Sequence, residues 1–246
     1  HVDAAVRKAI AKGLDPVTAI QMATLNPATY FRLDRVGAVA PGRRANLLVV
    51  SDLDALTIDA VYVGGREVAA GGRLAEDLPR PAPISVPPSM KVDLDSIDLA
   101  IPAAGERVRI IEVIPDQVVT REMRAAPTVI DGQVVADTKR DLLKLAVVER
   151  HTGSGNVGLG LATGFGLSKG RLAASVAHDS HNIIAIGADD GDMREAVKAV
   201  VHLGGGFAAV VNGQVKATVP LPIAGLMSDA PMAVVRRQLD GIIQVA

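Results

Sequence analysis

The chain has 246 residues, of which 49% are hydrophobic and 22% charged, so it can form one large globular domain or two smaller ones. Its 26 basic and 27 acidic side chains give a net charge of −1, which leaves no global field to attract nucleic acid or an anionic membrane. Cysteine is absent and only 2% of the residues are aromatic, which excludes disulfides, thiolate metal sites and extended base-stacking surfaces. We expect a cytoplasmic protein with an aliphatic core and neither a membrane nor a nucleic-acid partner.

The first residues are expected to be helical. Apolar residues from Val2 onward follow helical spacing until Gly13. Two short helices follow, each with a good N-cap before a proline at the first helical position. They are 16–24, capped by Asp15, and 27–31, capped by Asn26. The chain starts at His1, on the flank of a helix and without Met, so we expect it to belong to a longer protein.

Residues 37–78 change to the pattern of a small β domain. The predicted strands are Ala45–Val50, Ala60–Val63 and Arg66–Ala69. Gly64 and Gly65 between the last two predict a two-residue hairpin turn, because both turn positions need a positive φ. So few strands leave an edge or face unpartnered, and we expect further strands from elsewhere in a parent protein.

Residues 79–100 are expected to form a linker. Five prolines lie close together, at positions 79, 81, 83, 87 and 88. Such a run favours an extended backbone, which predicts a domain boundary in this region.

Residues 101–246 are expected to form a layered α+β domain. The predicted strands are 107–113, 117–124, 128–130, 133–136, 142–148, 173–177, 183–187, 207–211 and 214–219. Asp131-Gly132 and Asn212-Gly213 predict hairpin turns. One helix is expected to start at a capping box from Asp192 to Glu195 and to end at Gly204. The last helix starts near Pro231 and is expected to bury Met232, Val235, Leu239 and Ile242.

Two glycine patterns match known motifs in form only. Gly153, Gly155 and Gly158 fit G-x-G-x-x-G, but the further glycines that follow would prevent the helix on which that motif depends, so we expect a glycine-rich turn. Gly166 to Gly170 fits G-x-S-x-G around Ser168, but it leads into a strand rather than a helix and is expected to be a surface turn.

The strongest candidate for chemistry is the polar segment of His178, Asp179, His181 and Asn182, where two apolar strands meet. These side chains could bind a metal, act as an acid–base pair or hydrogen-bond a polar substrate. They could equally form a turn whose polar groups satisfy one another. Ser228 could line a pocket or cap the last helix.

Two groups of segments resemble a known family. Ala23–Ala28, Gly37–Val50 and Val61–Arg66 are similar to the end of an amidohydrolase-superfamily enzyme. Arg140–His151, Gly164–Leu167, Ser175–Asn182 and Leu221–Asp229 resemble the C-terminal domain of the bacterial-type adenine deaminases. The resemblance covers essentially the whole chain and is most specific over residues 175–182.

This resemblance implies a division of the chain. Residues 1–36 would be the last helices of a (β/α)₈ barrel, residues 37–78 part of the small β domain, and residues 101–246 the C-terminal α+β domain. It also implies hydrolysis of adenine to hypoxanthine and ammonia in purine salvage, with manganese or iron in the barrel, and a homo-oligomer.

The family's metal ligands and catalytic residues would lie upstream of His1. We therefore assign no catalytic residue and no metal ligand within this chain, and we expect the chain by itself to be inactive. His178, Asp179, His181, Asn182 and Ser228 are candidates for the substrate pocket. The alternative is a non-catalytic module for oligomerisation or ligand binding.

Overall fold

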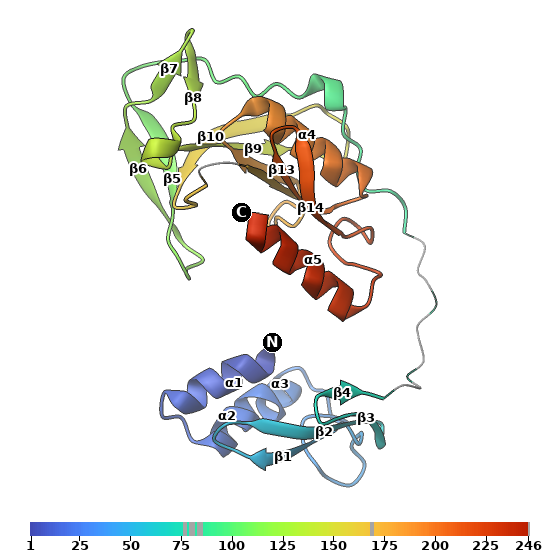
Figure 1. Ribbon diagram of the computed structural model, residues 1–246. Coiled ribbons are helices and arrows are strands. Elements are labelled where there is room, and N and C mark those ends of the chain that lie inside the picture. The colour runs from blue at the N-terminus through green and yellow to red at the C-terminus, as the bar shows by residue number, and fades with distance from the viewer. Residues whose placement is uncertain (76–77, 79–81, 83–85, 168–169, 246) are drawn as a thin grey trace. The chain divides into compact units, whose positions relative to one another are not determined.

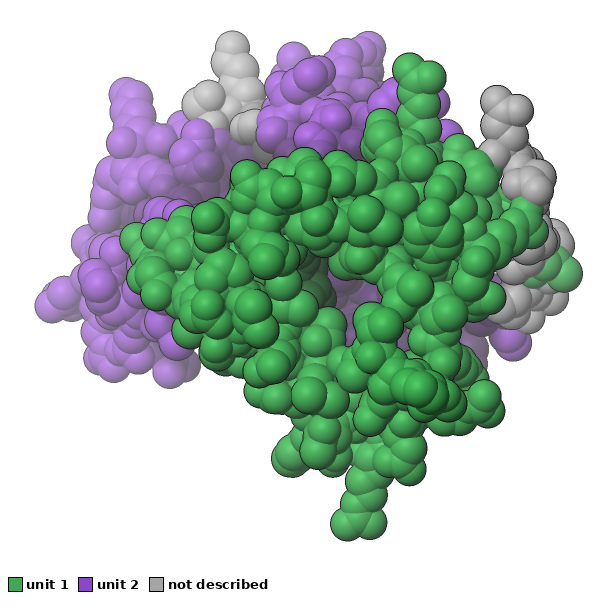
Figure 2. Space-filling view, turned by 90° about the horizontal axis from the view of Figure 1, so that it is seen from below, with its two compact units in different colours: residues 1–82 green, residues 83–246 purple. Residues whose placement is uncertain are grey.

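The computed structural model describes residues 1–75, 78, 82, 86–167 and 170–245. The chain is a mixed α+β protein that divides into two compact units, residues 1–82 and 83–246 (Figures 1 and 2). Pro79, Pro81 and Pro83 of the expected linker, and Ser168 of the G-x-S-x-G pattern, lie outside the described residues. Within the described ranges, no helix has the length and hydrophobicity needed to span a membrane.

Unit 1 begins with three helices, α1 (Val2–Ala11), α2 (Pro16–Ala23) and α3 (Leu25–Tyr30). The carboxylate of Asp15 accepts a hydrogen bond from the backbone N–H of Thr18 and caps α2, as predicted. The start expected for the third helix is wrong, because α3 begins at Leu25 and Asn26 lies inside it. Pro27 is tolerated there because the first-turn N–H groups of a helix have no intrahelical acceptor.

Four antiparallel strands complete unit 1 in the order β1-β2-β3-β4. They are β1 (Leu47–Asp52), β2 (Thr57–Val63), β3 (Arg66–Ala70) and β4 (Arg73–Leu74). Gly64 and Gly65 have φ values of 60° and 83°, which confirms the predicted turn. The described core of this unit is small and is built around Val6, Ala19 and Leu56.

Unit 2 is built on an eight-stranded sheet with the order β14-β13-β11-β12-β9-β10-β5-β6 (Figure 1). Its strands are β5 (Val108–Val113), β6 (Thr120–Ala125), β9 (Leu143–Val148), β10 (Val157–Thr163), β11 (Arg171–Ala174), β12 (Ile183–Gly187), β13 (Gly206–Val211) and β14 (Gln214–Pro220). A separate hairpin consists of β7 (Thr128–Ile130) and β8 (Gln133–Val135). Hairpin turns at Asp131-Gly132 and Asn212-Gly213 have the predicted positive φ values.

Two helices cover opposite faces of the sheet. Helix α4 (Asp190–His202) packs on the face that carries Ala208 and Val210 of β13. Helix α5 (Met232–Val245) packs on the face that carries Phe207 and Ala209. Because successive residues of a strand point to opposite faces, the alternation along β13 supplies both cores. The layered α+β arrangement therefore follows from continuously apolar strands.

Residues 86–100 differ from the linker that the prolines suggested. Ile97 and Leu99 are buried in the core beneath α4, with Met90 and Val92 packed against them. A 3₁₀ turn, Leu94–Ser96, lies between these contacts. Alternating apolar side chains after Pro88 thus have enough hydrophobic area to pack as part of unit 2.

Three further expectations for unit 2 are corrected. The glycine-rich stretch contains β10, which pairs with β9 from Val157 to Ala162 and includes Gly158 and Gly160. Helix α4 starts earlier than its expected capping box, because Asp189 accepts from the N–H of Asp192 and is the N-cap. Met232 is exposed, whereas Ile242 is buried as predicted.

An ion pair between a buried lysine and a part-exposed aspartate joins the sheet to α4. Lys144 of β9 is 4% exposed, and its ammonium donates to the carboxylate of Asp190 at 2.8 Å and to the carbonyl of Leu99 at 2.6 Å. The same cation therefore fixes the helix start and the segment before β5.

Replacing the two members of this pair is expected to have unequal effects on stability. Asp190→Asn leaves the ammonium of Lys144 with the Leu99 carbonyl but no counter-charge and should cost about 2 to 3 kcal/mol, because solvent around the part-exposed Asp190 already weakens the pair. Lys144→Met removes the buried charge and should cost about 1 kcal/mol. Urea unfolding of both variants at pH 7 measures the difference. Equal losses, or a larger loss for Lys144→Met, would contradict this account of the pair.

Candidate functional site

The predicted polar segment forms the connection between β11 and β12. His178 and Asp179 project into solvent, with side chains 89% and 94% exposed. The Nδ1 atom of His178 lies 2.9 Å from Oδ1 of Asp179. Both side chains are thus accessible to a ligand or to another protein segment, and no packing contact with the described residues fixes their conformation.

His181 and Asn182 are half-buried at the end of the same loop. His181 has a φ of 52°, in the left-handed region, and its N–H donates to the carbonyl of Ala177 at 2.6 Å. Oδ1 of Asn182 is buried and has no hydrogen-bond partner among the described residues. The loop therefore closes as a tight turn that leaves the imidazoles of His178 and His181 without a role in the core.

Ser228 lies in the connection between β14 and α5. Its hydroxyl accepts a hydrogen bond from the N–H of Ala230 at 3.1 Å. Ala230 precedes the first residue of α5, so this contact is a local turn and not the helix cap suggested as one alternative. No hydrogen bond between Ser228 and residues 178–182 is present in the described part of the chain.

The residue that sequence reasoning missed is Arg150, which lies two positions beyond β9 and is 1% exposed. Its guanidinium donates to the carbonyls of His181, Ser89 and Ala224 and to the hydroxyl of Ser89. We call this set of contacts the Arg150 junction. A signal was present, because Arg150 continues the alternation that buries Lys144, Ala146 and Val148.

Ser175 supplies a second connection between the two candidate loops. Its buried hydroxyl donates to the carbonyl of Gly225 and accepts from the N–H of Gly206 at 2.8 Å. Residues 175–182 and 221–228 are far apart in the sequence and follow different strands of the sheet. Ser175 and the Arg150 junction hold these two loops together. The structure thus unites three of the segments that carry the family resemblance.

Gly153 and Gly155 of the G-x-G-x-x-G pattern lie in a turn organised by Glu149, and Gly158 already belongs to β10. The carboxylate of Glu149 accepts hydrogen bonds from the N–H groups of His151, Thr152 and Ser154 and from two hydroxyls. The hydroxyl of Thr152, followed by these backbone donors, holds the pKa of Glu149 well below its usual value. His151 in turn contacts the carbonyl of Ser180 through Nε2 at 3.1 Å, which ties this turn to the candidate loop.

We expect this turn to persist in acid. A carboxyl whose pKa is lower in the folded state stabilises that state above its unfolded pKa, and the contribution disappears only as the pH falls through the lower, folded value. Amide exchange at Thr152 and Ser154 should therefore stay slow from pH 7 to pH 4 after correction for intrinsic rates. Glu149→Gln should show fast exchange across the whole range. Loss of protection near pH 4.5 in the unmodified chain would contradict the assignment.

The described residues do not fit a metal site. Within the described ranges, no group of three or more His, Cys, Asp or Glu side chains is placed to hold a metal ion. His178, Asp179 and His181 are therefore not a ligand set as they stand here.

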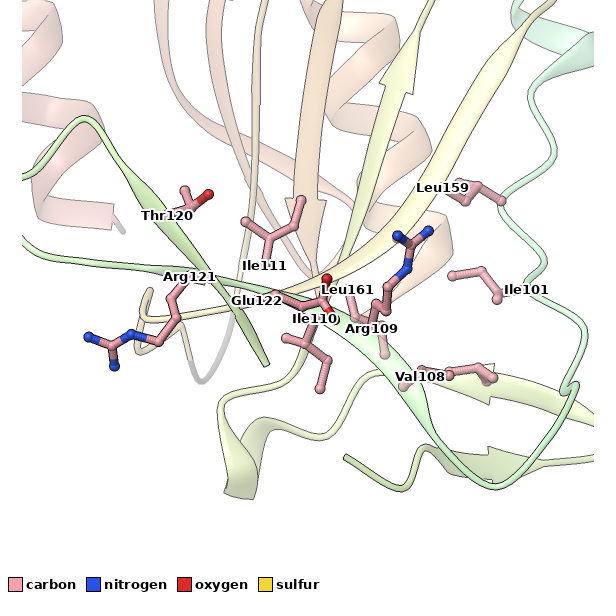
Figure 3. A pocket seen from close by; sticks show the side chains of 12 residues that line it. Ile101, Val108, Arg109, Ile110, Ile111, Thr120, Arg121, Glu122, Leu159 and Leu161 are labelled. Carbon is pink, nitrogen blue, oxygen red and sulfur yellow. The ribbon is translucent and has the colours of Figure 1, made fainter. Parts of the chain in front are cut away.

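A cavity of about 550 Å³ lies elsewhere in unit 2, between β5, β6 and β10 (Figure 3). Apolar side chains from β5 and β10 and charged side chains line it, among them Ile110, Leu161, Arg109, Arg121 and Glu122. The strands β5 and β10 are paired only at two positions, next to this cavity. None of the predicted site residues lines it, so the loops and the cavity are separate features.

Comparison with known proteins matches both units. The family model of the adenine deaminase C-terminal domain matches residues 117–246, and that of the amidohydrolase family matches residues 3–68. A protein named adenine deaminase from Desulfatibacillum aliphaticivorans is 52% identical over 251 residues, which cover 100% of this chain and 43% of that relative.

Two further relatives carry the same name. The relative from Methanothrix thermoacetophila is 45% identical and that from Bacillus pumilus 39% identical, over 99% and 98% of this chain. The chain spans 42% of the length of each.

Proposed function

The chain belongs to the adenine deaminase C-terminal domain family, and we propose that it is the C-terminal part of a longer adenine deaminase. The observation that carries the proposal is similarity over the whole chain to relatives of that name, together with matches to both family models. The proposed reaction is hydrolysis of adenine to hypoxanthine and ammonia. A water oxygen bonds to the ring carbon that bears the amino group, and the exocyclic C–N bond breaks. The amino group takes one proton of the water and leaves as ammonia, and the other proton remains on the lactam of hypoxanthine.

Exposed apolar groups on unit 1 support the proposal that a further segment of the longer protein packs against it. A hollow of about 400 Å³ between its helices is lined by Val2, Val6, Leu14, Met22 and other apolar residues. Tyr30 and Phe31, which stack edge to face, are also largely exposed. Exposed apolar groups of this extent mark interaction surfaces. We take these helices to be the last part of an amidohydrolase barrel, and the preceding part of that barrel to cover them.

The catalytic centre is assigned to the segment outside this chain. The manganese or iron of the enzyme would be held there. We propose that the 246-residue chain by itself is inactive. Its own contribution is a wall of the purine pocket.

His178, Asp179, His181, Asn182 and Ser228 are the proposed pocket residues. Imidazole, carboxylate and amide groups can donate to and accept from the ring nitrogens and the amino group of adenine. His178 and Asp179 contact each other, and both side chains are almost fully exposed. Their remaining nitrogen and oxygen atoms are therefore available for such contacts. Adenine is uncharged, so its binding does not need an excess of basic residues, and the chain has a net charge of −1.

The test is conversion of adenine by the longer protein. Purified with manganese or iron, it should release ammonia and hypoxanthine in equal amounts, and chelation should abolish the reaction. Guanine and adenosine serve as comparison substrates. Turnover of one of these but not of adenine would overturn the proposed substrate.

An oligomerisation role is the alternative, and one observation favours it. Val118 is 100% exposed and Val119 59% exposed just before β6, an edge strand of the sheet. Sedimentation of the chain with and without adenine separates the two functions. An oligomer that forms without adenine and that Val118→Asp dissociates would support the alternative, whereas a monomer that adenine stabilises would leave it without support.

A further inference from the structure

We infer that Arg150 is a positioning residue of the purine site, acting through the two loops that its guanidinium holds together. The inference rests on the proposed function, because it assumes that residues 178–182 and 228 face the substrate. It adds a residue that touches no substrate and is distant in sequence from both loops.

The guanidinium of Arg150 reaches three separate segments of the chain. Its Nε donates to the carbonyl of His181, Nη2 to that of Ala224 at 3.1 Å, and Nη1 to that of Ser89 at 3.0 Å. These acceptors come from three separate segments. The planar guanidinium has five N–H donors in fixed directions, so it can hydrogen-bond three segments at once. The ammonium of a lysine lacks this fixed geometry.

Two of these contacts lie at residues with left-handed backbone conformations. His181 has a left-handed φ, and its carbonyl is the acceptor for Arg150. Ala224 also has a left-handed φ, at 58°. Such conformations cost energy in non-glycine residues and persist where the surroundings hold them. In each loop the guanidinium thus binds a backbone turn that would otherwise relax.

The positive charge of Arg150 is balanced by carbonyl groups. Among the ion pairs of the described residues, none involves Arg150. Burial lowers the pKa of its guanidinium from the ordinary value. A buried cation that only carbonyl groups neutralise is a poor source of folding stability, because hydrophobic side chains of similar volume stabilise a fold as much or more. Its particular effect is to fix the directions of three backbone segments.

The close packing around the junction leaves little freedom for compensation. A Cβ added to Gly225 would lie 3.0 Å from Nη1 of Arg150 and 2.7 Å from Cε of Met90. A Cβ added to Gly205 would lie 2.3 Å from Cα of Gly225. Loss of the guanidinium therefore leaves a space that the neighbouring backbone cannot fill without moving the loop of Ala224.

The test compares two buried basic residues of one sheet region. Arg150→Met and Lys144→Met each remove a cation from β9 or its extension, but only Arg150 contacts the loops. In the 246-residue chain, Arg150→Met should speed amide exchange at least tenfold at His181, Leu226 and Met227, while Lys144→Met leaves these three amides unchanged. Unchanged exchange in Arg150→Met would overturn the inference.

The second readout is catalysis by the longer enzyme. Arg150→Met should lower kcat/KM for adenine at least tenfold, mainly through KM, and Lys144→Met should leave it within twofold even where both lower Tm equally. Millimolar guanidinium should restore part of the activity of Arg150→Ala. Equal kinetic losses in Arg150→Met and Lys144→Met would reduce Arg150 to a stability role and overturn the inference.

The two readouts separate this inference from the proposed function. Faster loop exchange with unchanged kcat/KM would show that Arg150 holds the loops but that the loops do not form the purine site, which overturns the positioning role. If the longer protein does not act on adenine, the proposed function fails, and the exchange data alone decide whether Arg150 holds the loops. Should Arg150→Met not fold, Arg150→Lys is used, with a smaller increase in exchange expected and none contradicting the inference.

Discussion

Replacement of Gly206 by alanine is expected to unfold unit 2 or to reduce its unfolding free energy by more than about 4 kcal/mol. Gly206 opens β13 with a φ of 127°, and a Cβ there would lie 1.8 Å from the carbonyl oxygen of Val219. Pairing of Gly206 with Pro220 of β14 prevents the strands from separating. Ser175 exchanges hydrogen bonds with Gly206, so the damage should reach the start of the candidate loop.

Gly213→Ala is the matched control for this prediction. Gly213 also has a positive φ, 71°, but no heavy atom lies within 4 Å of its added Cβ. Only backbone strain of about 1 kcal/mol is expected. Urea unfolding of both variants measures the difference, and equal losses would show that the contact with Val219 is not the reason for glycine at position 206.

Substitution of the loop histidines is expected to reduce activity without reducing stability. In the longer enzyme, His178→Ala and His181→Asn should each lower kcat/KM for adenine by 10- to 100-fold, on the order of 1.4 to 2.7 kcal/mol of transition-state stabilisation. His178 is almost fully exposed, so its removal should change the free energy of unfolding by less than about 0.5 kcal/mol. Asparagine is chosen at position 181 because it tolerates a left-handed φ.

His202→Ala is the control for the histidine variants. His202 ends α4, is exposed and has no connection to the Arg150 junction. Its substitution should leave kcat/KM unchanged. Unaltered kinetics in His178→Ala and His181→Asn would show that the 178–182 loop does not reach the substrate.

The sequence predicted those elements whose signals are local. Hairpin turns at Gly64-Gly65, Asp131-Gly132 and Asn212-Gly213 need positive φ values, which few residue types adopt, so their residues specify them. Strand β10 was missed because Gly158 and Gly160 have poor strand propensity. Its stability comes from six paired positions along β9, which are not local in sequence.

The sequence indicated where the candidate loop lies, but not the hydrogen bonds that join it to other segments. His178, Asp179 and His181 stand out by residue type at a strand junction, and the structure places them in one loop. Their connection to residues 221–228 depends on Arg150, Ser175 and Gly225, whose roles arise only when distant segments pack. Residues 86–100 show the same limit, because prolines indicated an extended chain while Ile97 and Leu99 pack in the core.

The most direct measurement of the central claim is ammonia release from adenine by the 246-residue chain and by the longer protein, side by side with added manganese. The account predicts steady turnover by the longer protein and no release above background by the chain. The chain should nevertheless be folded, with slow amide exchange in β9 and β12. Turnover by the folded chain, or none by the longer protein when loaded with metal, would contradict the account.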